Sequence, residues 1–175
     1  MQHDYTIPAD DITLRPMSAT DSEVYRRLRN REDNRNFFFD ASEISAEQQR
    51  AWYERYLSDQ ASYMFSVYET NANAFIGGIG LYDIDRAAGT AEVGRILIDR
   101  QIAAGHGYGA QAIVALSRFA LQQMNLRELT AYIYHTNLPS RKSFAKAGYE
   151  ECALQQDNQI VRMCFTGAQP DEVNA

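Results

Sequence analysis

The chain has 175 residues, of which 45% are hydrophobic and 11% aromatic, so it can close one good core and is expected to form one domain. Seventeen Lys and Arg against 23 Asp and Glu give a formal charge of -6, which provides no general reason to expect a nucleic acid or an anionic membrane as partner. No apolar run approaches the roughly 18 residues of a membrane span, and the N-terminus has no signal-peptide pattern. We therefore expect a soluble, cytoplasmic, single-domain protein over 1–175, with its core at about 12–166 and flexible termini.

The first elements along the chain are a strand and a helix. Residues 12–17, "ITLRPM", alternate apolar and polar side chains as a half-buried strand does, and Pro16 discourages its continuation. Thr20 or Asp21 can cap a helix that runs to about Arg29.

A second helix is predicted by a capping box of Ser45 and Gln48 before "AEQQRAWYERYLSD". Within it Trp52, Tyr56 and Leu57 are spaced to share one face. Aromatic residues at this spacing are usually core residues, and we expect these three to be buried.

Three strand-like runs follow, at residues 63–70, 74–85 and 91–99, joined by the turns "NANA" and "RAAGT". They predict an antiparallel meander. Glycines at 77, 78 and 80 indicate a twisted or bulged second strand.

The last third alternates strand and helix. A turn with glycines at 105, 107 and 109 leads into a helix over about 110–124, and "RELTAYIYH" predicts a strand after it, in a right-handed crossover with a parallel partner. Pro139 and Gly148 bracket a short helix. Two final strands surround the turn "DN" at 157–158, and the tail from 168 is expected to be frayed. The two cysteines, Cys152 and Cys164, have no metal-ligand spacing. We expect buried thiols and no metal site.

The glycine turn indicates an anion site. A helix begins with unpaired backbone N–H groups and a partial positive charge, and glycine lets a phosphate approach the main chain closely. The alternative is an ordinary tight turn between strand and helix. The spacing matches neither a dinucleotide fingerprint nor a Walker loop.

"GHGYGAQAI", the strand before it and "NLPSRKSFAKAGY" about thirty residues later resemble the two central motifs of the GNAT superfamily of acetyl-CoA-dependent N-acetyltransferases. The order of elements over residues 12–165 is similar too. The resemblance implies an α/β (α+β) fold with a mixed, mostly antiparallel sheet of about seven strands and about four flanking helices. It also implies acetyl-CoA as co-substrate, and it is compatible with a homodimer.

The resemblance places the cofactor residue by residue. Backbone amides of the glycine turn would hold the CoA pyrophosphate, and the strand would pair with pantetheine. Asn137 would contact CoA, Arg141 could reach a phosphate or be solvated, and His106 is either a phosphate contact or an exposed turn residue. Ala104 stands where the family has Gln or Arg, which removes a side chain but no backbone donor. The expected cofactor-binding residues are Gly105, His106, Gly107, Tyr108, Gly109, Ala110, Ile96, Leu97, Ile98, Asn137 and Arg141.

For catalysis, the resemblance places Glu92 near the amine as general base, with Asp83 and Asp85 in reserve. The alternatives are a salt-bridged strand residue and turn-forming aspartates. An oxyanion donor would come from a backbone bulge near Ile98. Phe144 stands where many relatives have an acidic tyrosine, so the proton for the thiolate would come from Tyr149, another hydroxyl or water, or the thiolate would leave unassisted.

The acceptor is expected beside the N-terminal segment, at Arg29, Arg31, Arg35, Phe38 and Tyr82. An arginine cluster beside aromatics can bind a phosphorylated acceptor, and a solvated helix end followed by core phenylalanines is the alternative. The segment resembles the GNAT branch that acetylates nucleotide-linked amino sugars, which grades into ribosomal-protein N-terminal acetyltransferases. We therefore expect a small amine, with a nucleotide-linked amino sugar as the candidate, and a protein N-terminus or a non-catalytic acyl-CoA sensor as alternatives.

Overall fold

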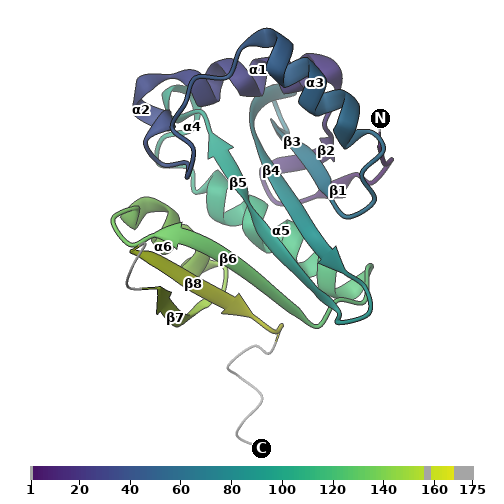
Figure 1. Cartoon of the computed structure of the whole chain (residues 1–175), viewed down its shortest axis with the longest axis vertical. Helices are drawn as coiled ribbons and strands as arrows, with labels where there is room; N and C mark the ends of the chain where they lie inside the picture. Colours follow the sequence, from purple (N-terminus) through teal and green to yellow (C-terminus); the bar gives the residue numbers. More distant parts are fainter. Residues whose placement is uncertain (1, 156–158, 168–175) are drawn as a thin grey trace, which may run out of the picture.

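The computed structural model describes residues 2–155 and 159–167, which form one open eight-stranded sheet with helices on both faces (Figure 1). Across the sheet the strands lie in the order β1-β2-β3-β4-β5-β6-β8-β7. The strands are β1 Ile7–Pro8, β2 Ile12–Pro16, β3 Tyr63–Glu69, β4 Ala74–Asp85, β5 Thr90–Ile98, β6 Glu128–Tyr134, β7 Glu150–Gln155 and β8 Ile160–Phe165. The helices are α1 Ala19–Asn30, α2 Glu32–Arg35, α3 Ala46–Tyr56, α4 Arg100–Ala103, α5 Tyr108–Gln122 and α6 Leu138–Lys146.

The predicted architecture is confirmed, including the meander of β3, β4 and β5 and the parallel pairing of β5 with β6. Three very short elements, β1, α2 and α4, make up the difference from about seven strands and four helices. The turn predicted at 157–158 and the tail from 168 lie outside the described residues.

The N-terminal segment, which was expected to be flexible, contributes a short strand to the sheet. β1 pairs with β2, and the His3 ring packs 4.6 Å from the Phe65 ring. Burial of this imidazole lowers the pKa of His3, because the charged form loses its hydration. This strand could not be predicted from the sequence, because neither aromatic packing nor a two-residue strand produces a periodic pattern of apolar residues.

Capping side chains set the starts of α1 and α3. The predicted box of Ser45 and Gln48 is confirmed, but α1 begins two or three residues earlier than expected. Ser18 is its cap and accepts a hydrogen bond from the Asp21 N–H at 3.0 Å, while the Asp21 carboxylate accepts one from the Ser18 N–H. Asp21 is therefore the third helical residue rather than the cap.

The core has two parts, one on each face of the sheet. The larger lies between the sheet and α5, and the smaller lies under α1 and α3, where Tyr25 and Tyr56 are buried. A Cβ atom at Gly78 would lie 2.8 Å from the Tyr25 ring, so this glycine allows α1 to lie close to β4. Leu57, expected in the core, is 42% exposed, because α3 ends at Tyr56 and the chain turns away there.

β5 and β6 diverge part of the way along their length, as Figure 1 shows. Their parallel pairing covers only Thr90 to Glu92, opposite Glu128 to Thr130. β5 contains a bulge, because its register against β4 gains one residue between Gly94 and Leu97, and Arg95 within it has φ 49°. In the described chain, the edge of β5 that faces β6 has no strand partner beyond Glu92.

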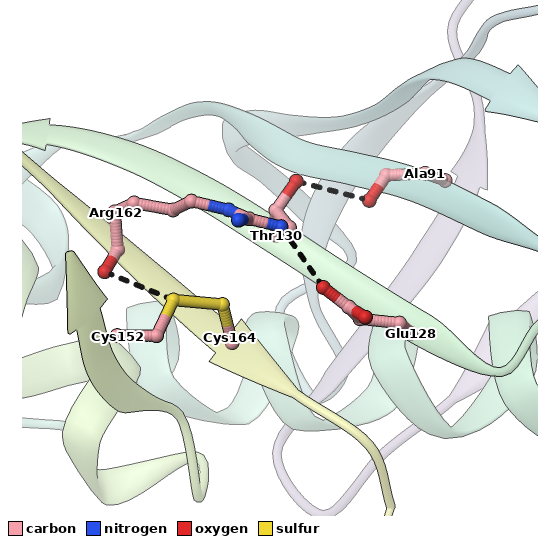
Figure 2. The surroundings of a disulfide bond; sticks show 6 residues. All are labelled: Ala91, Glu128, Thr130, Cys152, Arg162 and Cys164. Carbon is pink, nitrogen blue, oxygen red and sulfur yellow. Dashed lines mark hydrogen bonds and ion pairs between the residues drawn. A yellow bond between two sulfur atoms is a disulfide. The ribbon is translucent and has the colours of Figure 1, made fainter.

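The two cysteines form a disulfide rather than the expected pair of buried thiols (Figure 2). Cys152 is exposed on β7 and Cys164 is half-buried on β8, and their Cα atoms lie 6.1 Å apart. The spacing of two cysteines does not reveal the register of two strands, so this pairing could not be predicted from the sequence alone. No helix in the described part of the chain is long and apolar enough to cross a membrane.

Breaking this disulfide is expected to lower the free energy of unfolding by roughly 2–4 kcal/mol, because the cross-link restricts the unfolded chain. Thermal unfolding of the protein with and without dithiothreitol would measure the effect. Cys152→Ser is the control, since it has no disulfide to lose and should show one Tm in both conditions. An equal Tm for the unmodified protein with and without reductant would contradict the prediction.

Candidate active site

The divergence of β5 and β6 coincides with a cleft of about 1210 Å³. Its walls come from β5, β6, the glycine turn before α5, the start of α6 and the segment between α2 and α3. The cleft therefore brings together the glycine motif, the Asn137 motif and the predicted acceptor segment.

The glycine turn forms one end of the cleft. Gly105 and Gly107 have φ values of +85° and +73°, and no protein atom lies within 4 Å of where their Cβ atoms would be. Gly107 is the cap of α5, and the first intrahelical bond runs from the Gln111 N–H to the Gly107 carbonyl at 3.1 Å. The amides of Tyr108, Gly109 and Ala110 therefore have no partner within the helix.

This end fits a phosphate group, because it combines unpaired amides, a helix N-terminus and space that a side chain would fill. Gly105, Gly107, Tyr108 and Gly109 all line the cleft. The His106 side chain does not line the cleft. Its ring stacks on Tyr108 with centroids 5.1 Å apart, and the backbone N–H of His106 donates to the Ala103 carbonyl at 3.4 Å. The structure thus gives no support to His106 as a phosphate contact.

The predicted pantetheine wall also borders the cleft. Ile96 and Ile98 lie about 4 Å from the Cβ position of Gly109, so β5 and α5 meet here. Leu97 is 9% exposed and belongs to the core under α1. Alternate residues of β5 thus pack on opposite faces of the sheet, as the pleat of a strand requires, and all three border the cleft.

Of the two residues expected from the later motif, only Asn137 borders the cleft. Its side chain caps α6 and accepts a hydrogen bond from the Ser140 N–H at 3.2 Å. Arg141 instead pairs with Glu151 through its Nε at 3.0 Å and donates to the His135 carbonyl at 2.9 Å. The arrangement favours a role for Arg141 in fixing α6 to β7 over the predicted phosphate contact.

Glu92 and Tyr82 lie side by side across the β4–β5 pair, and the Tyr82 hydroxyl donates a hydrogen bond to the Glu92 carboxylate. A Cβ at Gly94 would lie 2.5 Å from that hydroxyl, so glycine makes room for the contact. Partial burial raises the pKa of Glu92, since the carboxylate loses hydration. The nearby Asp83 also raises this pKa, while Tyr82 and Arg95 oppose the shift. A carboxylate of raised pKa in a cleft is suited to accept a proton.

The reserve carboxylates are less suited. Asp83 and Asp85 are exposed and do not line the cleft. Asp85 accepts hydrogen bonds from the N–H groups of Ala87 and Ala88, at 2.9 and 2.8 Å, and so stabilises the turn after β4.

Tyr149 does not reach the cleft. Its hydroxyl bonds to the Ser117 hydroxyl at 2.8 Å, and its ring packs between Phe144 and Phe165 in the core. Burial raises the pKa of Tyr149. Phe144 is also buried but borders the cleft. The geometry therefore does not support Tyr149 as the general acid. This residue follows the end of α6, and its side chain turns toward α5.

The predicted arginine cluster is dispersed. Arg31 pairs with Asp33 and Asp99, both at 3.0 Å, and Arg35 lies 3.8 Å from Glu43; neither arginine lines the cleft. Arg29 does border it but is 8% exposed, donates to the Asp40 and Ser42 carbonyls and lies over the Phe38 ring. Helical spacing explains the dispersal, since residues 29, 31 and 35 leave α1 and α2 in different directions.

Aromatic residues line the cleft: Trp52, which was expected in the core, and the three phenylalanines at 37–39, for which an acceptor site and the core were both open. Phe37 and Phe39 are 37% and 55% exposed, and Phe39 packs against Tyr134 of β6. Trp52 stacks on Tyr56, with centroids 5.4 Å apart, and faces the cleft. Three consecutive phenylalanines cannot all point inward from one strand or helix, and this is the signal that could have identified the wall.

The bulge in β5 lies at Arg95, three residues before the position where an oxyanion donor was expected. The Arg95 carbonyl accepts a hydrogen bond from the Tyr25 hydroxyl at 2.6 Å. The Arg95 guanidinium lies 4.3 Å from the centroid of the Tyr82 ring. Arg95, Tyr82 and Glu92 thus form one contiguous group in the cleft, which we call the Arg95 group.

Residues 11–150 match the family model described as "Acetyltransferase (GNAT) domain". The "Probable N-acetyltransferase YjcK" of Bacillus subtilis (strain 168) is 28% identical over 157 residues, 84% of each chain. The spermidine N-acetyltransferase from Vibrio cholerae, solved in complex with CoA and spermine, superposes with a TM-score of 0.81 at 20% identity, over 89% of this chain and 95% of that one. FdhC, a nucleotide-linked sugar GNAT solved in its apo form, gives 0.79 at 16% identity, over 94% and 91%. Since the family match covers most of the chain and the fold agrees with it, the protein belongs to the GNAT family and is an N-acetyltransferase.

Proposed function

We propose that the protein transfers an acetyl group from acetyl-CoA to the primary amine of a small molecule, with Glu92 as general base. One observation carries the proposal: a single cleft has the unpaired amides of the glycine turn at one end and the Glu92–Tyr82 pair in its wall, with the open edge of β5 between them.

The glycine turn is the cofactor end. Gly105, Gly107 and Gly109, with the amides of Tyr108 and Ala110, hold the pyrophosphate, and the free edge of Ile96 to Ile98 aligns the pantetheine. When bound, acetyl-CoA supplies the thioester that makes the acetyl group transferable. The fold likeness to an acetyltransferase solved with CoA supports this assignment.

Glu92 serves the amine end. An alkylamine is mostly protonated at neutral pH, with lysine near 10.4 as a guide, and only its neutral form attacks a thioester. Glu92 removes the proton, directly or through one water, and the Tyr82 hydroxyl holds the carboxylate in place. The departing sulfur needs no proton from a tyrosine at position 144, because a thiolate is weakly basic and can leave unassisted.

The acceptor is a small amine that lies against the aromatic wall of Phe38, Phe39 and Trp52. The fold likeness to FdhC supports a nucleotide-linked amino sugar as a candidate for this acceptor. Its phosphates would not meet Arg31 and Arg35, which lie outside the cleft.

The test is turnover with a broad panel of amines. Purified protein with acetyl-CoA is expected to release CoA thiol only when an acceptor is present, and mass spectrometry should show the acetylated product. Calorimetric binding of acetyl-CoA without turnover of any small amine or peptide would favour a non-catalytic sensor. Acetylation of peptides alone would assign the protein N-terminus as acceptor.

A further inference from the structure

The Arg95 group contains a cation that the fold does not use for an ion pair. Four arginines line the cleft: Arg29, Arg55, Arg95 and Arg100. Arg29 is occupied by two carbonyls. Among the residues that the structure describes, the other three guanidinium groups have no carboxylate within 4.0 Å.

Within residues 2–155 and 159–167, three carboxylates line the cleft against its four arginines, so one positive charge is left over, and none of the three lies within 4.0 Å of the Arg95 guanidinium. Asp40 accepts a hydrogen bond from the Ser42 N–H at 2.8 Å, and Glu43 faces Arg35 at 3.8 Å. Glu92 is held by Tyr82. The side of the cleft near the proposed base therefore presents an exposed cation to whatever enters.

Arg95 is held in its position by the fold. Its backbone has φ 49°, which is uncommon for a residue with a side chain, and the Tyr25 hydroxyl holds its carbonyl at 2.6 Å. Its guanidinium lies over the ring of Tyr82, 4.3 Å from the centroid. The Tyr82 ring thus carries the cation on its face and Glu92 at its hydroxyl.

We infer that the acceptor is an amine that also carries an anionic group, a carboxylate or a phosphate, and that Arg95 binds this group while Glu92 receives the amine proton. This inference rests on the proposed function and specifies its substrate class. A guanidinium matches both anions, since its planar fork can donate two parallel hydrogen bonds. A polycationic amine would be repelled by Arg95, Arg55 and Arg100.

Matched acceptor pairs provide the test: L-phenylalanine against L-phenylalanine amide for a carboxylate, and O-phosphoethanolamine against ethanolamine for a phosphate, with spermidine as the polycation. The anionic member of at least one pair is expected to have the higher kcat/KM, and the pair that shows it identifies the anion. The amino group of L-phenylalanine amide is less basic than that of L-phenylalanine. The basicity of the amine therefore cannot produce a preference for L-phenylalanine.

Arg95→Gln is expected to raise KM for the preferred anionic acceptor by roughly 10- to 100-fold, because it loses a charge-assisted hydrogen bond. KM for the neutral mate and for acetyl-CoA should not change. Arg27→Gln is the matched control, since Arg27 lies on α1 with a side chain that is 68% exposed and does not line the cleft.

Several outcomes would overturn the inference while leaving the proposed function intact. The first is turnover of the neutral members of the pairs, or of spermidine, that equals or exceeds turnover of the anionic members. The second is a preference for the anionic member that persists in Arg95→Gln. No turnover of any amine would overturn the proposed function instead. Calorimetric titration of the CoA-bound protein with the same pairs then tests the inference separately, and equal affinity within each pair would overturn it.

Discussion

Replacing Glu92 by glutamine is expected to lower kcat by roughly 10²- to 10⁴-fold, the usual contribution of a positioned general base. The amide keeps the shape of the side chain and can still contact the Tyr82 hydroxyl, but it cannot accept a proton. The affinity for acetyl-CoA, measured by calorimetry, should not change, because Glu92 lies near the start of β5 whereas the glycine turn follows its other end.

The pH profile distinguishes a base from a merely structural residue. Burial raises the pKa of Glu92 above its ordinary value. As the pH falls through this raised pKa, the carboxylate takes up a proton and the rate should fall, at a higher pH than an unperturbed glutamate would give. This limb should be absent from the residual activity of Glu92→Gln.

Asp83→Asn is the control for Glu92→Gln, since Asp83 is exposed and only adds to the raised pKa of Glu92. It should retain most of the rate and move the acid limb to a lower pH. An unchanged kcat in Glu92→Gln would reject Glu92 as the base, and a large loss in Asp83→Asn would point to the neighbouring strand position.

Gly109→Trp is expected to weaken acetyl-CoA binding by at least about 100-fold, because hydrogen bonds to a charged group contribute about 1.5–3 kcal/mol each and several would be blocked. Gly109 borders the cleft and has ordinary helical backbone, so the substitution adds bulk without the strain that a positive φ would bring. Calorimetric titration with acetyl-CoA measures the loss.

The matched control is Gly109→Ala. Its Cβ would meet the Ser143 hydroxyl at 3.8 Å and Ile96 at 3.9 Å, which are ordinary contacts. The alanine variant should therefore fold and bind far better than the tryptophan variant. Undiminished binding by a folded Gly109→Trp would place the cofactor elsewhere.

The sequence predicted those features that depend on local patterns. The capping box at Ser45, the antiparallel meander and the crossover into β6 each have a local or near-local signature, and all three are present. The glycine turn was also predictable, because positive φ and open space at Gly105 and Gly107 are what glycine permits.

The features that it missed depend on which way side chains turn in three dimensions. Arg31 and Arg35 are close to Arg29 in the sequence, yet neither lines the cleft: Arg31 pairs with Asp99, and Arg35 faces Glu43 at the rim. Tyr149 follows a recognisable helix end, but its hydroxyl faces Ser117 in the core. Arg95 gave no signal at all, because a bulge displaces it and a tyrosine seventy residues earlier holds it there.

The short pairing of β5 with β6 has a consequence for how sequences with this fold can diverge. Beyond Glu92, β5 presents main-chain groups to the cleft, and every residue type carries the same main-chain groups. Substitutions along Ile96 to Ile98 can therefore accumulate while the edge to which we assign the cofactor stays chemically constant. In the proposed function the aromatic wall and Arg95 act through side chains, so a single substitution there would alter the choice of acceptor. Cofactor and acceptor specificity would then change at different rates.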